Sequence, residues 1–224
     1  MADAKALRTT RLILIPTVIT LVVTILRVVG ELKHWPTPWV NNAAGGGGAL
    51  LGISWLPIIF GPYFAMKLAG AGEGPPSNGR AIGYAFGALL VLAAGGALFA
   101  GTVKHANFLT LLGLVLLFWS AFVPGMGWKP LGTTLLAYAF AARIPVVIVM
   151  YYAITANGGA GLGTHYDRVP PAMAHLGPMQ KFIYDGLLIQ FTLWIGWTVV
   201  SGAIVGTIVN AIANRGKREV ITSA

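Results

Sequence analysis

Residues 11–30 read RLILIPTVITLVVTILRVVG, and this stretch decides the fold class of the chain. Its only charged residues are Arg11 and Arg27. Because a bilayer core about 30 Å thick needs roughly 20 apolar residues in a helix to cross it, the stretch predicts a transmembrane helix. Basic residues precede it, as in a signal peptide, but no small-residue cleavage site follows. We therefore expect this helix to be retained.

Further apolar segments of spanning length follow along the chain. They lie at about 49–68, 81–101, 108–124, 131–156 and 183–214. The ten-residue alternation of a membrane β-barrel is not found. The sequence thus predicts an all-α bundle of six transmembrane helices, forming one integral membrane domain over residues 1–224.

The composition supports this class. Of the 224 residues, 56% are hydrophobic and only 9% are charged, whereas a soluble domain carries about 25% charged residues. Such a chain is neither a soluble domain, a disordered chain nor a nucleic-acid module, despite its formal net charge of +9. Cysteine is absent, which excludes disulfides and thiolate metal sites. No motif identifies a cofactor.

Lysine and arginine are distributed unequally between the two sides of the predicted bundle. One side would hold Lys5, Arg8, Arg11, Lys67, Arg80, Lys129, Arg215, Lys217 and Arg218, and the other Arg27, Lys33, Lys104, Arg168 and Lys181. Positive residues favour the cytoplasmic side. We therefore predict that both termini are cytoplasmic and that the protein resides in a membrane of the bacterial inner type.

A polar stripe runs along the first predicted helix. It consists of Thr17, Thr20, Thr24, Arg27, Glu31 and His34, spaced by steps of three and four residues. This spacing places them on one helix face, and polar groups avoid lipid, so we expect that face to point into the bundle or a wet cavity. Arg27 and Glu31 are one turn apart. They form either a structural ion pair at the membrane surface or part of a solute path.

Two later segments also carry polar groups. Arg143 falls near the middle of its span, followed by Pro145, and no acidic residue is expected at that depth. Carbonyl groups, an aromatic ring, water or an anionic ligand would then face it. In the last span Gln190 belongs to an inward stripe with Trp194, Trp197 and Ser201, and Lys181 precedes Asp185 by one α-helical turn, which predicts a helix pair.

Histidines and glycines supply the remaining candidates. The four histidines His34, His105, His165 and His175 all fall on the predicted outer side. They are either a speculative metal or haem ligand set or solvated loop residues. The small-residue pairs Gly83/Gly87 and Gly202/Gly206 predict close helix contacts, within one bundle or between protomers.

Three functional classes remain open. The first is a small transporter or channel with a polar path opening to the outer face, formed by Thr20, Thr24, Arg27, Glu31, Arg143 and Gln190. The second is a non-catalytic subunit of a larger membrane complex, and the third a membrane enzyme or electron carrier with a histidine metal or haem site. The lack of a catalytic motif favours a non-enzymatic role. Expected partners are the lipid bilayer and either further copies of the chain or a membrane complex, with no nucleic acid.

Overall fold

The computed structural model of the chain describes residues 2–46, 48–103 and 107–215, and these contain helices and loops but no strand. The helices are α1 (Ala2–Leu32), α2 (Leu56–Gly70), α3 (Asn78–Thr102), α4 (Phe108–Ser120), α5 (Val123–Gly127), α6 (Lys129–Gly159), α7 (Pro178–Lys181) and α8 (Ile195–Ala213). A π-helix, η3 (Phe182–Trp194), joins α7 to α8, and two short 3-10 turns are η1 (Ala44–Gly46) and η2 (Pro171–Met173). The all-α prediction is confirmed for the described residues.

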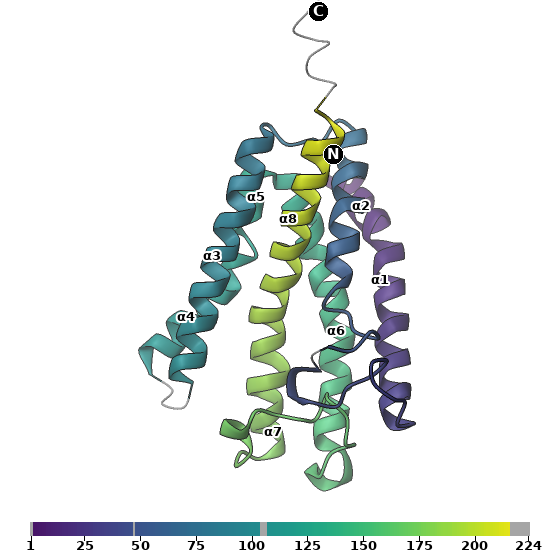
Figure 1. Cartoon of the computed structure of the whole chain (residues 1–224), viewed down its shortest axis with the longest axis vertical. Helices are drawn as coiled ribbons and strands as arrows, with labels where there is room; N and C mark the ends of the chain where they lie inside the picture. The colour runs from purple at the N-terminus through teal and green to yellow at the C-terminus, as the bar shows by residue number, and fades with distance from the viewer. Residues whose placement is uncertain (1, 47, 104–106, 216–224) are drawn as a thin grey trace, which may run out of the picture.

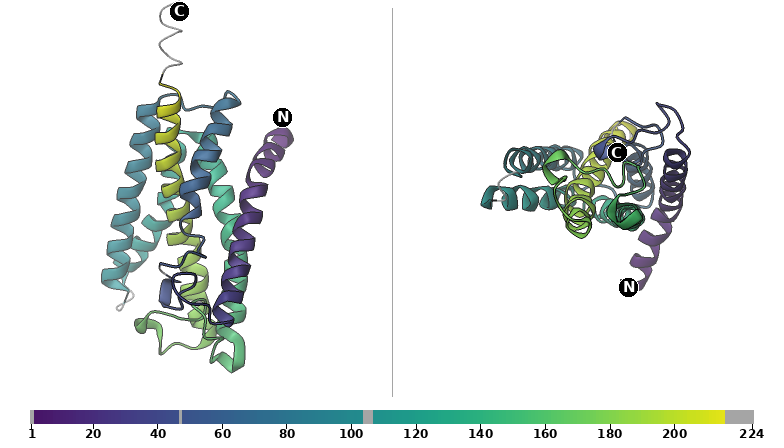
Figure 2. Two further views of the ribbon diagram at one scale, coloured as in Figure 1. Left: turned by 45° about the vertical axis from the view of Figure 1, so that its right-hand side comes forward. Right: turned by 90° about the horizontal axis from the view of Figure 1, so that it is seen from below.

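The helices run along the long axis of an elongated bundle (Figures 1 and 2). The start of α1 and the end of α8 lie at one end, which we call the terminal end. Two long connections, residues 33–55 and 160–177, lie at the opposite end, the loop end. Helix α8 packs against α2, α3 and α6, while α1 lies at the edge of the bundle against α6.

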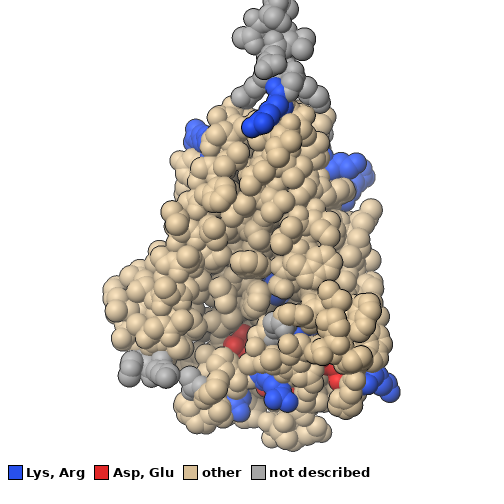
Figure 3. All heavy atoms as spheres, in the orientation of Figure 1, with Lys and Arg blue, Asp and Glu red and all other residues tan. Residues whose placement is uncertain are grey.

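Four helical segments are long and apolar enough to cross a membrane. They are Thr9–Leu32, Asn78–Thr102, Lys129–Gly159 and Pro178–Ala213. On the face shown in Figure 3, charged side chains gather toward the two ends and a broad uncharged band lies between them. The prediction of six spans is thus supported for four helices. For α2 and α4, which are shorter, it stays a prediction.

Two predicted segments are interrupted at prolines. The segment expected at 49–68 becomes helical only at Leu56, and the one expected at 108–124 breaks after Ser120 before resuming as α5. Pro57 and Pro124 lie in the first turns of α2 and α5, where the missing N–H removes no helix hydrogen bond. A continuous helix would place each proline in its interior, where it breaks a bond and clashes with the preceding turn.

The predicted last span is continuous, but its first half is π-helical rather than α-helical. Thirteen residues, Phe182–Trp194, have this geometry, in which hydrogen bonds run from i to i+5. The predicted pair between Lys181 and Asp185 is wrong, because neither side chain forms an ion pair within the described part of the chain.

Helices α2 and α8 cross at a contact made by glycines. A Cβ at Gly61 would collide with the carbonyl group of Gly202, and one at Gly206 would lie 2.8 Å from the carbonyl oxygen of Gly61. Small residues allow this approach, which supplies van der Waals contact where lipid provides no hydrophobic drive. The other predicted pair behaves differently, because a Cβ at Gly83 or Gly87 meets nothing within 4 Å among the described atoms.

We expect Gly61→Ala to lower the melting temperature of the detergent-purified protein by several degrees. The added methyl group meets backbone rather than a flexible side chain, and overpacking costs about 1–3 kcal/mol, with about 2–4 °C lost per kcal/mol in a chain of this size. The matched control is Gly96→Ala in α3, which has open space around it. Equal melting temperatures for the two variants would contradict the glycine crossing.

Candidate functional site

The polar stripe of α1 faces the bundle along most of its length. Thr20, Thr24, Arg27 and Glu31 are all buried, whereas the opposite face of α1 is exposed. The hydroxyl groups of Thr20 and Tyr138 are 2.8 Å apart, which ties α1 to α6. The stripe stops there, since His34 lies beyond the end of α1 with a φ of 55° and is exposed.

Glu31 joins α1 to the loop that follows α6. Its Oε1 accepts a hydrogen bond from Nε of Arg27 at 2.8 Å and lies 2.7 Å from Nδ1 of His165. Its Oε2 accepts the backbone N–H of His165 at 2.8 Å. The Glu31 side chain is fully buried, and these contacts offset the cost of burying its carboxylate.

The same loop is held internally by Asp167. Its carboxylate accepts hydrogen bonds from the backbone N–H groups of Gly163 and Thr164 and from the Thr164 hydroxyl. Gly161 lies against this carboxylate with a φ of +85°, a conformation that a side chain would strain. The loop therefore reaches Glu31 as a structured unit.

We expect Glu31→Gln to loosen this loop. Removing one member of a buried, hydrogen-bonded charge pair costs about 3–5 kcal/mol, and an amide has only one acceptor oxygen, so its NH2 group would replace one of the two oxygens that now accept from Arg27 and His165. Trypsin should then cleave faster after Arg168 in the loop. Glu73→Gln, a change at a glutamate near the terminal end, is the control and should leave cleavage unchanged; equal rates for both variants would refute the role of Glu31.

His165 is held as a neutral imidazole. Burial lowers the pKa of His165 below its ordinary value of 6.5, and the charge of Arg27 acts in the same direction. The hydrogen bond to Glu31 and the charge of Asp167 oppose this shift without reversing it. Because a carboxylate only accepts, we assign the imidazole proton to Nδ1.

This lowered pKa makes stability depend on pH. The folded protein binds a proton at His165 less readily than the unfolded chain. The contribution of neutral His165 to the free energy of unfolding is therefore present above pH 6.5 and is lost as the pH falls below that value. We expect the melting temperature to fall between about pH 7.5 and about pH 5.5. His165→Asn should flatten this dependence, and an equally steep profile in that variant would assign the effect to other groups.

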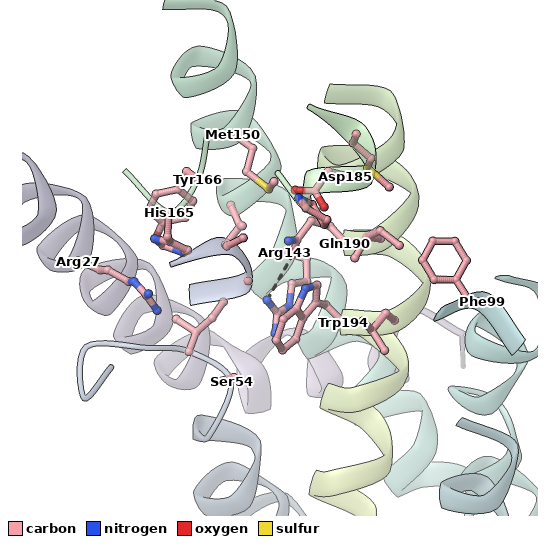
Figure 4. A pocket seen from close by; sticks show the side chains of 18 of the residues that line it. Arg27, Ser54, Phe99, Arg143, Met150, His165, Tyr166, Asp185, Gln190 and Trp194 are labelled. Atoms are coloured by element: carbon pink, nitrogen blue, oxygen red, sulfur yellow. Dashed lines mark hydrogen bonds between the residues drawn. The ribbon is translucent and has the colours of Figure 1, made fainter. Parts of the chain in front are cut away.

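A cavity of about 470 Å³ lies beneath the two loops, between α6 and η3. Arg143, Met150 and Val146 line it from α6, Asp185, Gln190 and Trp194 from η3, and Arg27 and His165 from the loop-end network. Figure 4 shows Arg143 beside Trp194, with Asp185 and Trp194 on the side of η3 that faces it. Residues of both long loops complete the wall, namely Ala44, Gly45, Ile53, Ser54, Pro170, Pro171 and Met173.

Arg143 is buried in this wall with weak partners. It is 4% exposed, and its Nη atoms lie 3.4 Å from Oε1 of Gln190 and 3.5 Å from the Thr198 hydroxyl, both at the long limit for hydrogen bonds. Its guanidinium carbon lies 4.8 Å from the centre of the Trp194 ring, a cation–π distance. Its Nε–H has no hydrogen-bond partner, and no described acid pairs with it.

The structure brings together part of the predicted solute path. Arg27, Arg143 and Gln190 line one cavity, whereas Thr20, Thr24 and Glu31 do not line it and instead make helix or loop contacts. The sequence places Trp194 on one inward stripe with Gln190, but it does not predict Asp185 or His165 as members of this site. An α-helical spacing in the last span places Asp185 away from Gln190 and Trp194, so it does not predict that Asp185 lines the cavity. No local signal connects His165 with α1.

The predicted histidine set is dispersed in the structure. His34 is exposed, His165 binds Glu31, and His175 lines a separate cavity near α4. His105 lies outside the described residues. Among the described residues, no group of three or more His, Cys, Asp or Glu side chains is placed to hold a metal ion, so the metal or haem hypothesis stays a prediction that this geometry does not support.

Long apolar helices around a partly polar cavity are compatible with the class of integral membrane proteins. Comparison with protein-family models, with curated proteins and with solved structures finds no significant match to this chain. The cavity is therefore the feature from which a function can be inferred.

Proposed function

We propose that the chain is a membrane transporter that binds a small solute through an anionic group, with Arg143 as the binding residue. The observation that carries this proposal is the buried Nε–H of Arg143, which has no partner. A guanidinium presents five N–H donors, and leaving one unpaired in a low-dielectric site is costly. A carboxylate or similar anion in the cavity would accept from this donor and neutralise the charge.

The position and size of the cavity support a transported solute. Its volume of about 470 Å³ is within the range of roughly 300–1,000 Å³ typical of small-molecule sites. Arg143 is the fifteenth residue of the 31-residue helix α6, so it lies near the middle of the bundle. Substrate sites of secondary transporters lie at this depth.

The cavity reaches the loop end but is separated from the terminal end by packed side chains. Tyr138 precedes Arg143 by five residues on α6, or about 7.5 Å toward the terminal end. Its ring packs against Phe60 and Phe64 at centroid distances of 5.5 Å, and its hydroxyl contacts Thr20. We interpret this aromatic layer as the closed side of a path whose open side is the loop end.

Helices with internal prolines surround this path. Pro16, Pro62 and Pro145 lie inside α1, α2 and α6, where each removes a helix hydrogen bond. Helices kink preferentially at such positions. In this proposal the aromatic layer opens by movement of α2 and α6 about these positions.

The orientation and assembly belong to the same proposal. The excess of lysine and arginine at the terminal end supports a cytoplasmic position of that end, in a membrane of the bacterial inner type, with the cavity taking solute from outside. The unoccupied small-residue face at Gly83 and Gly87 supports packing of α3 against another helix, in a homo-oligomer or a membrane complex.

The test measures binding of carboxylate probes to the purified full-length protein at about pH 8, where the probes are ionised. Acetate, butyrate, 4-methylpentanoate and leucine are titrated by calorimetry, with 4-methylpentanamide as the uncharged comparison. We expect Arg143→Gln to weaken carboxylate binding at least about tenfold, because hydrogen bonds to charged groups contribute about 1.5–3 kcal/mol. Uptake of the tightest-binding probe into proteoliposomes should fall in parallel.

The matched control is Arg80→Gln, a change at an exposed arginine near the terminal end. It should leave binding and uptake unchanged. Arg143→Gln should also keep or raise the melting temperature, because it removes a buried charge without an acidic partner. Absence of binding by every carboxylate, or binding that survives Arg143→Gln, would overturn the proposed function.

A further inference from the structure

The π-helix η3 gives the cavity a second charged group. At about 100° per residue, an α-helix would place Asp185 and Trp194, nine residues apart, on opposite faces. Bonds from i to i+5 correspond to about 4.4 residues per turn, which brings the same two positions to within about 20° of one another. Both side chains indeed line the cavity, on the side of η3 that faces Arg143 (Figure 4).

Asp185 is not explained by contacts within the protein. Its side chain is half-buried in the cavity wall. It forms neither a hydrogen bond nor an ion pair with any described residue, Arg143 and Lys181 included. Glu31 provides the contrast, since that buried carboxylate accepts hydrogen bonds from both α1 and the loop. π-Helical geometry is rare and is frequently found at functional sites.

We propose that the cavity binds a zwitterionic solute of the amino-acid type, whose carboxylate contacts Arg143 and whose ammonium group contacts Asp185. This inference rests on the proposed function, since it assigns the substrate class of the same site. One bound molecule would neutralise both unpaired charges, which neither a simple anion nor a simple cation does. A dicarboxylate would be repelled by Asp185, and a simple amine by Arg143 and Arg27.

The rest of the wall fits the side chain of such a solute. The cavity lining also includes apolar side chains, with Val146 and Met150 from α6 and Ile189 and Leu193 from η3. Methionine is unbranched and adapts its shape to a bound apolar group. An amino acid with an aliphatic side chain therefore matches both the charges and the surface.

The test compares three probes of one carbon skeleton on the full-length protein. At about pH 7, leucine carries both charges, 4-methylpentanoate only the carboxylate, and leucinamide is mostly in its ammonium form. We expect leucine to bind at least about tenfold more tightly than either of the others. Asp185→Asn should weaken leucine binding at least about tenfold, to the level of 4-methylpentanoate, while 4-methylpentanoate itself binds no worse.

Two further variants distinguish loss of the Asp185 carboxylate from misfolding as the cause of weaker binding. Asp185→Glu keeps the carboxylate and should retain the preference for leucine, and Glu73→Gln, at a glutamate outside the cavity, should change nothing. Leucine binding that is unaffected by Asp185→Asn, or tighter binding of 4-methylpentanoate than of leucine by the wild-type protein, overturns the zwitterion inference while the Arg143 site stands. Failure of all carboxylates to bind overturns the proposed function as well.

Discussion

The guanidinium of Arg143, held near the middle of an apolar bundle, is the interaction around which the loop-end half of the structure is arranged. A charge at that depth is tolerated only where protein groups or water face it. Trp194 supplies a ring and Gln190 an amide oxygen, and both come from η3. The π-helix, the cavity and the loops that cover it are thus all neighbours of one costly side chain.

The irregular backbone of the loop-end half is tolerated for the same reason. Residues 49–55 precede α2 without helical structure, and backbone groups of this kind cannot face lipid. Here they are bonded inside the protein: the indole N–H of Trp197 donates to the carbonyl of Ser54, and that of Trp55 donates to the carbonyl of Leu50. Because Ile53 and Ser54 also line the cavity, this segment forms part of the cavity wall.

The sequence predicts regular helices well and departures from regularity poorly. The stripe from Thr20 to Glu31 is correctly oriented because a continuous α-helix keeps steps of three and four on one face. Pro57 and Pro124 were visible, but hydropathy alone does not show that a helix starts at them. The π-helix is beyond such reasoning, since its hydrogen-bond pattern depends on packing against α4 and α6, and it changes which face Asp185 occupies.

The charged side chains in the loop-end half of the bundle are of two kinds, those that other protein groups pair with and those that they do not. Glu31 and Arg27 are paired at 2.8 Å and joined to His165, so their contacts hold a loop to α1. Arg143 keeps an unpartnered N–H, and Asp185 keeps an unpaired carboxylate in the same cavity. Removing a charge from water is costly unless protein groups pair with it. Protein contacts offset the cost of burying Arg27 and Glu31, but not that of burying Arg143 and Asp185. This difference is the physical reason to assign Arg143 and Asp185 to a bound solute.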